Sequence, residues 1–405
     1  MLFRSPITIN GNGAQVFFVT PSTTLTLSNV TLTGGYTAST FGGGAIYNNM
    51  GTVNLNNCTL SGNRGSSQGG AIFNQSGVVN ITNSTIRDNT ADTYGPSPLY
   101  EPFFAAGGGL YNLEGTVNVV NSTFSNNNAW AGGGVYTKNG YVSVTNSTFS
   151  GNNAVVSVGG NGGAIYVDGG GVSITHGKIA ADNAGYAGGI YTNGGWVYAI
   201  NTILANNSIQ NCFGTVYDGS GNLQFNPASG CVGVSADPRL GALADNGGLT
   251  KTMALQAGSA AINLATANCL PNDQRGFARI LSDGKCDAGA YEYGAKGNTT
   301  TTLTSSPNPS VYGQSVTFTA TVTASAGGAP TGPVVFMEGA TLLGVVGLTN
   351  GTATFGMSAL SFGVHTITAN YIGDANYNGS ASAGITHVVA NPPLFLPLIL
   401  RNLGR

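Results

Sequence analysis

The 405-residue sequence contains very little charge. Charged residues make up 7% of the chain, and 13 basic against 15 acidic residues leave a formal net charge of −2. This composition excludes a long exposed helix, a coiled coil and a disordered acidic tail, because each of these needs charge to stay solvated. It also argues against nucleic acid as a partner, since phosphate neutralisation requires clustered lysine and arginine.

Several sequence signals are missing as well. There is no run of about 18 apolar residues, so no transmembrane span is expected. Residues 1–6 lack a basic region followed by a long apolar region, so we expect a chain that begins inside a structured unit, with its secretion signal missing from this sequence. The absence of paired metal-binding motifs and calcium repeats predicts neither a metal nor a cofactor.

The five cysteines lack the C-x-x-C spacing of a zinc or redox site. Two pairs lie close in sequence, and we predict the disulfides Cys212–Cys231 and Cys269–Cys286. Disulfides imply an oxidising, extracellular compartment. The remaining Cys58 is expected to be a small buried thiol, because it occupies a repeat position that serine fills in other copies.

The 64 glycines follow no three-residue period, which excludes collagen, but they do mark a longer repeat. The segment Gly43-Gly44-Ala45-Ile46-Tyr47 recurs with its aromatic residue at Phe73, Tyr111, Tyr136, Tyr166 and Tyr191. Ten residues after each aromatic stands an asparagine or, once, a histidine, and successive copies are 28, 26, 38, 25, 30 and 25 residues apart from Asn29 to Asn201. Insertions therefore fall at one place in the repeat.

Each repeat contains short segments in which apolar and polar residues alternate, such as Val53-Asn54-Leu55. Such alternation predicts strands with one buried face. A unit of about 25 residues cannot bury that face alone, but it can when units stack as coils. The sequence therefore predicts an all-β fold that begins with a right-handed parallel β-helix, with an aliphatic core stack. The stack comprises Ile46, Ile72, Leu110, Val135, Ile165 and Ile190.

Stacked coils place equivalent residues about 4.8 Å apart, so polar rows are expected to form ladders. We interpret two rows as structural. The first comprises Asn57, Asn83, Asn121, Asn146 and Asn201, and the second Asn63, Asn89, Asn127, Asn152, Asp182 and Asn207. His176 replaces asparagine in the first row, and we expect it to be satisfied by hydrogen bonds rather than catalytic.

These motifs resemble a known family. The Gly-Gly-x-aliphatic-aromatic and Asn-Ser-Thr elements resemble coils of secreted bacterial β-helix proteins related to the polymorphic outer-membrane proteins. Five later blocks, among them Asp273-Gln274-Arg275-Gly276, are similar to the choice-of-anchor segment that closes such helices. The resemblance implies an extracellular, surface-associated protein and assigns this segment no catalytic residues.

From Thr299 onward the sequence becomes threonine-rich and strongly alternating, which predicts antiparallel strands and an immunoglobulin-like β-sandwich. Residues 371–377 resemble a turn of bacterial Ig-like repeat domains on cell-surface proteins. The expected organisation is a β-helix over 1–232, a choice-of-anchor-like capping segment over 233–294, a linker over 295–309, the Ig-like sandwich over 310–390 and a tail over 391–405.

Parallel β-helices also carry polysaccharide lyases and glycoside hydrolases, whose chemistry needs converging carboxylates. Residues 1–232 hold seven acidic residues, and the nearest approach to a constellation is Glu114, Lys138 and Asp168. These three residues lie two or three positions after their aromatic in neighbouring repeats. They form either a catalytic patch or, as we favour, a solvated salt bridge on the coil surface.

Two sets of aromatic residues are binding candidates for an extracellular polysaccharide or a cell surface. The longest insertion contains Tyr94, Tyr100, Phe103 and Phe104, which either bind a ligand or fold back over an edge of the helix. The repeat aromatics Tyr111, Tyr136 and Tyr166 point away from the aliphatic stack, where they either contact sugar rings or stack on one another. The sequence favours a secreted, non-enzymatic structural or adhesin-like protein, with a polysaccharide lyase or hydrolase as the alternative.

Overall fold

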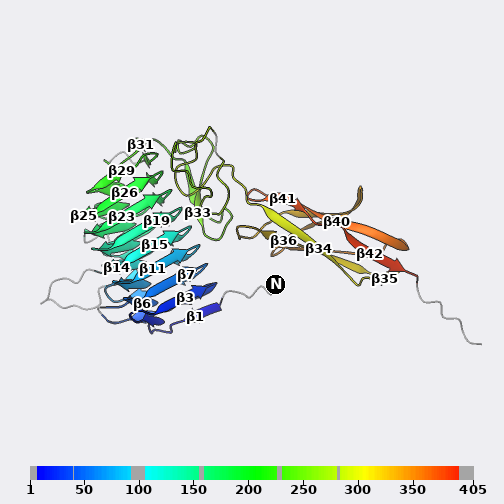
Figure 1. Ribbon diagram of the computed structural model, residues 1–405, viewed down its shortest axis with the longest axis horizontal. Helices are drawn as coiled ribbons and strands as arrows, with labels where there is room; N and C mark the ends of the chain where they lie inside the picture. Colours follow the sequence, from blue (N-terminus) through cyan, green and yellow to red (C-terminus); the bar gives the residue numbers. More distant parts are fainter. Residues whose placement is uncertain are drawn as a thin grey trace, which may run out of the picture. The chain divides into compact units, whose positions relative to one another are not determined.

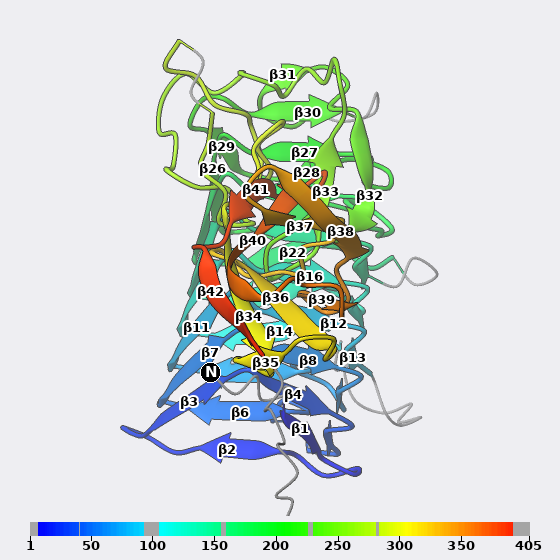
Figure 2. The ribbon, with the colours of Figure 1, turned by 90° about the vertical axis from the view of Figure 1, so that its right-hand side faces the viewer.

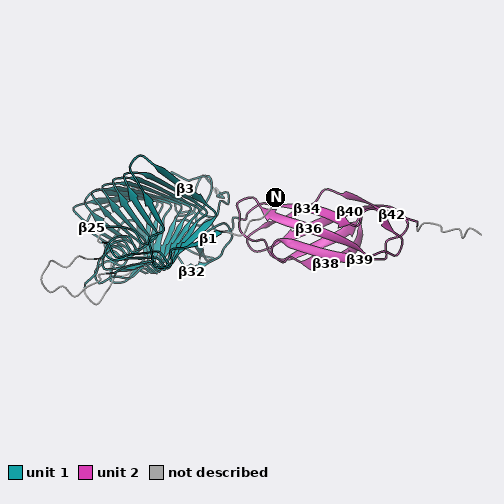
Figure 3. Ribbon diagram, turned by 90° about the horizontal axis from the view of Figure 1, so that it is seen from below, with its two compact units in different colours: residues 1–295 teal, residues 296–405 magenta. Residues whose placement is uncertain are grey.

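The computed structural model describes residues 7–39, 41–92, 105–154, 159–225, 230–280 and 283–391. The chain divides into two compact units, residues 1–295 and 296–405 (Figure 3). All regular elements in the described residues are β-strands, which confirms the predicted all-β class. The first unit contains a β-solenoid of about seven turns over residues 7–240 (Figure 1).

Three long parallel sheets run along the solenoid, because each coil adds a strand to each sheet. Sheet A contains β1 (Ile7–Asn10), β4 (Val30–Thr33), β8 (Thr59–Ser61), β12 (Thr85–Arg87), β16 (Thr123–Ser125), β20 (Thr148–Ser150), β24 (Lys178–Ala180), β27 (Ile203–Ala205), β30 (Leu223–Phe225) and β31 (Val234–Ser235). Sheet B contains β2 (Phe17–Val19), β6 (Ile46–Asn49), β10 (Ile72–Gln75), β14 (Leu110–Leu113), β18 (Val135–Lys138), β22 (Ile165–Asp168), β25 (Ile190–Asn193) and β28 (Cys212–Phe213).

The third long sheet and a short fourth one complete the coils. Sheet C contains β3 (Thr24–Ser28), β7 (Thr52–Asn56), β11 (Val78–Thr82), β15 (Thr116–Val120), β19 (Tyr141–Thr145), β23 (Gly171–Thr175), β26 (Trp196–Ile200) and β29 (Val216–Asp218). Sheet D contains β5 (Tyr36–Thr37), β9 (Arg64–Gly65), β13 (Thr90–Ala91), β17 (Asn128–Ala129) and β21 (Asn153–Ala154).

The interior of the solenoid is lined by the alternate apolar residues of all three long sheets. The predicted stack from Ile46 to Ile190 pairs in register through sheet B and is fully buried. Phe124 and Phe149 on sheet A stack inside the core with ring centroids 4.9 Å apart. Burial of this continuous column supplies the apolar driving force that no single coil possesses.

The paired glycines have two separate roles in each coil. Gly69 has a φ of +66°, a left-handed conformation that costs glycine little. Gly70 has no room for a side chain, because a Cβ there would collide with the carbonyl oxygen of Gly108 in the next coil. The high glycine content therefore follows from tight turns and from close approach between coils.

The first asparagine row shares a backbone conformation more than a hydrogen-bond pattern. Its residues have left-handed φ angles of 45–52°, and the histidine in the row, His176, has 52°. One amide-to-amide bond within the row joins Asn57 Nδ2 to Asn29 Oδ1, at 2.6 Å. The amides of Asn146 and Asn201 instead donate to carbonyl oxygens of the segment that follows the solenoid. Asparagine is common in this row because it tolerates the left-handed turn.

The second polar row forms a buried amide ladder. Nδ2 of Asn63 donates to Oδ1 of Asn89 at 3.0 Å, and the same bond recurs in each following coil up to Asp182, whose Oδ1 accepts from Asn152 at 2.8 Å. Each asparagine Nδ2 also donates to a backbone carbonyl of the preceding coil, as Asn152 does to Phe124. The ladder thus satisfies polar groups inside the solenoid.

Asp182 stands where the ladder requires a donor. Its Oδ2 is buried and has no donor beside it in the described residues, and burial raises the pKa of the carboxyl to about 8. The equivalent atom of every asparagine in the row donates a hydrogen bond, so the register places acceptors around Oδ2. A protonated carboxyl with its hydrogen on Oδ2 reproduces the asparagine pattern.

The first prediction concerns Asp182→Asn. The carboxyl has an ordinary pKa of 3.8 and a folded pKa of about 8, so the folded chain holds more protons between these values. The free energy of unfolding of the wild type should therefore fall as pH rises from about 4 to about 8 and level off above that. Asp182→Asn should flatten this dependence and raise stability by a few kcal/mol at pH 8.

Denaturant unfolding of both proteins across this pH range tests the prediction, with Asp88→Asn as the control for an exposed acid. A variant less stable than the wild type at pH 8 would show that Asp182 does not replace an asparagine in the ladder.

The second unit is a β-sandwich, as predicted. Thr301 and Leu303 of β34 are buried, so the strand contributes to the sandwich core although the stretch was expected to belong to the 295–309 linker. Its alternating threonines suit a strand with one buried face, which explains the difference. The first sheet contains β34 (Thr299–Ser306), β36 (Val316–Ala324) and β39 (Thr352–Met357). The second contains β35 (Ser310–Val311), β42 (Ile385–Ala390), β40 (Gly363–Gly373), β37 (Pro333–Glu338), β38 (Thr341–Gly347) and β41 (Asn378–Ala381).

The cysteines are paired as the sequence predicts. Disulfides join Cys212 to Cys231 and Cys269 to Cys286, with Cα atoms 5.2 and 5.9 Å apart. Cys58 is free and buried, and its backbone N–H donates to Ser84 of the next coil. The first disulfide closes the last coils, and the second lies inside the segment that follows them.

Candidate functional site

The repeat aromatics form a single stack along the outer face of sheet B. Neighbouring ring centroids are 4.8–5.4 Å apart from Phe18 to Phe213, and the rings from Tyr111 onward are nearly parallel. Tyr111 is buried, whereas Tyr136 and Tyr166 are half-buried. From Tyr136 to Tyr191 each ring has a neighbouring ring stacked on both of its faces, so a ligand can reach only the ring edges there. This geometry supports mutual stacking rather than stacking on sugars.

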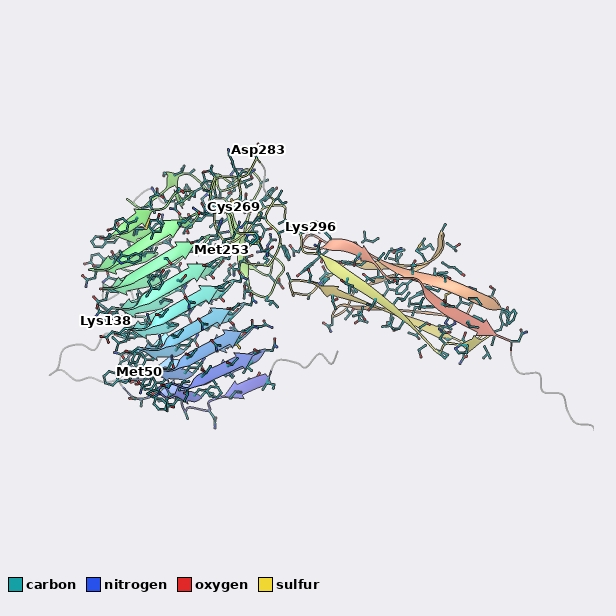
Figure 4. The ribbon with its side chains drawn as sticks, in the orientation of Figure 1. Met50, Lys138, Met253, Cys269, Asp283 and Lys296 are labelled. Carbon is teal, nitrogen blue, oxygen red and sulfur yellow. A yellow bond between two sulfur atoms is a disulfide. The ribbon has the colours of Figure 1, made fainter. Side chains whose placement is uncertain are left out.

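The proposed catalytic patch lies at the edge of this stack, where Lys138 projects from the solenoid on the side away from Cys269 (Figure 4). Lys138 and Asp168 are register partners on β18 and β22, with Nζ 3.8 Å from Oδ2 and both side chains partly exposed. Asp168 also accepts hydrogen bonds from Tyr136 Oη at 3.0 Å and from Asn193 Nδ2 at 3.1 Å. Glu114 occupies the turn after β14, where its backbone N–H donates to the Lys138 carbonyl.

The patch contains several groups whose protonation is fixed by their surroundings. Burial, reinforced by the Asp168 carboxylate, raises the pKa of Tyr111 and Tyr166 to about 12. Burial also raises the pKa of Tyr136, which donates to Asp168. These phenols remain protonated donors at neutral pH and do not act as bases. Lys138 and Asp168 thus form a surface ion pair, and both carboxylate oxygens of Asp168 accept hydrogen bonds from neighbouring side chains.

The other binding candidates, Tyr94, Tyr100, Phe103 and Phe104, lie outside the described residues. Ala106, just after them, packs against Phe73 and Tyr111 of the aromatic stack. The proposal that their loop binds a ligand therefore remains a prediction.

The part of sheet A from β16 to β27 is covered by the segment that follows the solenoid, whose strands β32 (Leu240–Ala244) and β33 (Thr252–Leu255) lie over it in Figure 2. The side chain of Gln274 forms hydrogen bonds between this segment and sheet A. Its Nε2 lies 2.9 Å from Thr123 Oγ1, and its Oε1 accepts from Thr148 Oγ1 at 2.6 Å. Residues 233–294, expected to cap the helix, thus also extend along its flank.

Two buried ion pairs order this segment. Arg275 donates twice to Asp273 Oδ2, at 2.7 and 2.9 Å, and its guanidinium lies 3.7 Å from the ring centroid of Tyr291. Arg279 donates to Glu292 Oε2 at 2.8 Å and to Asn146 Oδ1 of the solenoid at 3.0 Å. The side chains of both pairs are essentially inaccessible to solvent. Asp273 and Arg275 lie in one of the blocks that resemble the choice-of-anchor segment. Both ion pairs join residues of this segment to one another, and Arg279 also bonds the segment to the coils.

Buried titratable groups of the solenoid meet the same segment. Burial, together with the nearby Arg275 and Arg279, lowers the pKa of Lys178 to about 7, and its Nζ donates to the Met253 carbonyl at 2.6 Å. Burial lowers the pKa of His176 to about 3, so its imidazole is neutral and forms hydrogen bonds to the segment. Perturbed pKa values often mark active sites, but these groups have no solvent access. Their hydrogen bonds attach the segment to the solenoid.

A cavity of about 660 Å³ opens beside the covered part of sheet A. Its walls combine sheet A hydroxyls with Leu243, Leu249 and Lys251 of the covering segment. Asp88 is the one acid among its lining residues, and it is paired with Arg87. A glycosidic acid and base require two carboxyl groups, so this cavity lacks that constellation.

The sequence offered a signal for Asp273, Gln274 and Arg275, because they form one of the five motif blocks, but it did not show that they are buried. A second feature was missed. The outer face of sheet C carries four exposed rings near the last coils, Tyr141, Trp196, Tyr198 and Tyr217. In earlier coils the same columns carry mostly threonine, serine and asparagine, and this change of residue type along a repeat column could have revealed the rings.

Within the described residues there is no group of three or more histidine, cysteine, aspartate or glutamate side chains arranged to hold a metal ion. The same part of the chain has no helix long and apolar enough to cross a membrane.

The solenoid and the sandwich together fit a surface structural protein. Residues 303–390 match the family described as bacterial Ig-like domain (group 3), which covers most of the β-sandwich. No curated protein and no solved structure matches the chain. The Ig-like domain and the two disulfides are compatible with an extracellular location.

The second prediction concerns the buried pair of Arg275 and Asp273. Arg275→Met leaves the Asp273 carboxylate buried without its cation and should lower the free energy of unfolding by about 3–5 kcal/mol. Lys138→Met removes the exposed partner of Asp168 and should cost less than about 1 kcal/mol. Denaturant unfolding measures both. Equal effects of the two substitutions would contradict the stabilising role of the buried pair within the segment.

Proposed function

We propose that this chain is a non-enzymatic, extracellular or cell-surface protein of the adhesin type. The solenoid serves as a rigid support that presents a binding face, and the Ig-like domain serves as a spacer or attachment module. The observation that carries the proposal is the joining of a bacterial Ig-like domain to a solenoid whose coils are tied by continuous ladders.

The distribution of charge supports a role without catalysis. Asp168 has both oxygens engaged, Asp88 is paired with Arg87, and Asp182 is enclosed in the amide ladder. Two titratable groups with strongly shifted pKa values, His176 and Lys178, lie under the segment that covers sheet A. A lyase or hydrolase instead needs a base and an acid that both reach the substrate.

The third prediction is that the purified chain releases no products from polysaccharides. Neutral and uronate-containing polymers are incubated with the protein, and new reducing ends and unsaturated products are measured over several days. The expected result is the background rate. Product release that disappears in Asp168→Asn, but persists in Asp218→Asn, would overturn the proposal in favour of the enzyme.

The adhesive part of the proposal needs its own measurement. Beads coated with the chain should adhere to polysaccharide particles or to cell surfaces more than beads coated with residues 296–405 alone. A panel in which both kinds of bead adhere equally would remove the binding role from the solenoid.

A further inference from the structure

The outer face of sheet C carries a second set of aromatic residues, and the role assigned to it below rests on the proposed binding role of the solenoid. The sheet C platform is the set of four exposed aromatic residues Tyr141, Trp196, Tyr198 and Tyr217. The four residues are 39–54% exposed, whereas Tyr111 in the middle of the stack on sheet B is buried and Tyr136 and Tyr166 are half-buried. The four residues come from the neighbouring strands β19, β26 and β29, with β23 between the first two.

Small residues of β23 make room for the rings of the platform. Gly171 is the register partner of both Tyr141 and Trp196, and the Trp196 indole occupies the space that a Cβ of Gly171 would fill. The indole therefore lies above the backbone of β23, with its other side towards solvent. From the opposite side, Tyr141 Oη forms a hydrogen bond of 2.8 Å to Ser173 Oγ.

The rings of the platform are arranged differently from those of the stack on sheet B. The centroids of Tyr141 and Trp196 are 6.3 Å apart at an interplanar angle of 50°, so these rings do not cover each other's faces. Tyr198 and Tyr217 are register partners in the adjoining column. The result is a group of aromatic surfaces that rest on a sheet and remain accessible.

The surrounding face is polar but uncharged. Every outward position of sheet C from β3 to β26 is occupied by an uncharged residue, mostly threonine, serine or asparagine. Amides of Asn80 and Asn118 form a ladder with bonds of 2.8 Å that leads along the face towards the platform. From β3 to β26 the face thus has no cation to recognise a uronate, sulfate or phosphate, and no anion to recognise a basic polymer. The one acid in the strands of sheet C is Asp218 on β29, whose Oδ1 accepts a hydrogen bond from Asn222 Nδ2.

The size of the platform favours a narrow ligand over a folded partner. Four rings at this exposure offer roughly 350 Å² of surface, whereas a standard protein interface buries about 800 Å² per partner. Apolar ring faces among hydroxyls and amides match the surface of a sugar chain, which has apolar C–H faces and a rim of hydroxyl groups.

We propose that the sheet C platform binds a neutral polysaccharide, with sugar rings packed on Trp196 and its neighbouring tyrosines and sugar hydroxyls bonded to the serines and asparagines of the same face. This assignment differs from the candidate residues of sheet B, whose ring faces are occupied.

The test is affinity gel electrophoresis of the full chain in hydroxyethyl cellulose, mixed-linkage β-glucan and galactomannan, with polygalacturonate as the charged comparison. We expect at least one neutral polymer to retard the wild type, and Trp196→Ala to weaken that binding about tenfold. Tyr186→Ala is the matched control, because Tyr186 is an exposed tyrosine of the same unit outside sheet C. Its retardation should equal that of the wild type.

A second variant separates the geometry of the platform from simple loss of an aromatic. Gly171→Thr introduces a residue that this column already carries at Thr116 and Thr52, and it displaces the indole without removing it. This variant should fold normally, as judged by an unchanged circular dichroism spectrum and melting temperature. It should nevertheless bind the neutral polymer more weakly than the wild type does.

The outcomes distinguish this inference from the broader proposal. Neutral binding retained in both Trp196→Ala and Gly171→Thr, or wild-type retardation in polygalacturonate alone, would overturn the platform and leave the adhesive role standing. No retardation in any polymer overturns the platform, and if the coated beads also fail to adhere, the adhesive role is overturned with it.

Discussion

Hydrogen bonding between successive coils is the constraint on which the rest of this structure depends. Because parallel strands place each residue about 4.8 Å from its equivalents, whatever occupies one position is repeated beside itself. Aliphatic residues then make a continuous core, rings make a stack and amides make a ladder. Like charges in such a column repel one another, which explains the low charge of the solenoid. Where Asp182 interrupts the amide ladder, burial raises the pKa of its carboxyl, and the protonated form matches the asparagine pattern of the row.

The segment after the solenoid has no repeat of its own, so it cannot form ladders. It uses buried ion pairs instead, and it reaches into the rows of the coils through Gln274 and Arg279. Asn146 belongs to both the coils and the segment's contacts. Its left-handed backbone forms a turn of the coil, while its side-chain Nδ2 and Oδ1 form hydrogen bonds with the segment. One flank of the solenoid is thereby covered, whereas the outer face of sheet C carries exposed rings.

The candidate site illustrates what the repeat pattern can and cannot predict. The neighbouring positions of Lys138 and Asp168 followed from their equal offsets from Tyr136 and Tyr166, and the structure pairs them. Whether the aromatic row offered its faces to sugars did not follow, since alternation gives the side of the sheet but not the tilt of a ring. Trp196 and Gly171 were not singled out, because the relation between them depends on which way the indole leans across the sheet.

The sequence by itself determined the all-β class, the stacked coils, the core column and the two disulfides, because each follows from local alternation or from short sequence separations repeated many times. It also predicted the sandwich, although it assigned the residues of its first strand, β34, to a linker. Only the tertiary structure decided that Arg275, Asp273 and Lys178 are buried and which rings remain exposed. The physical reason is that burial there depends on a unique segment packing against residues more than 70 positions away, as Met253 does on Lys178, and no periodic pattern encodes such a contact.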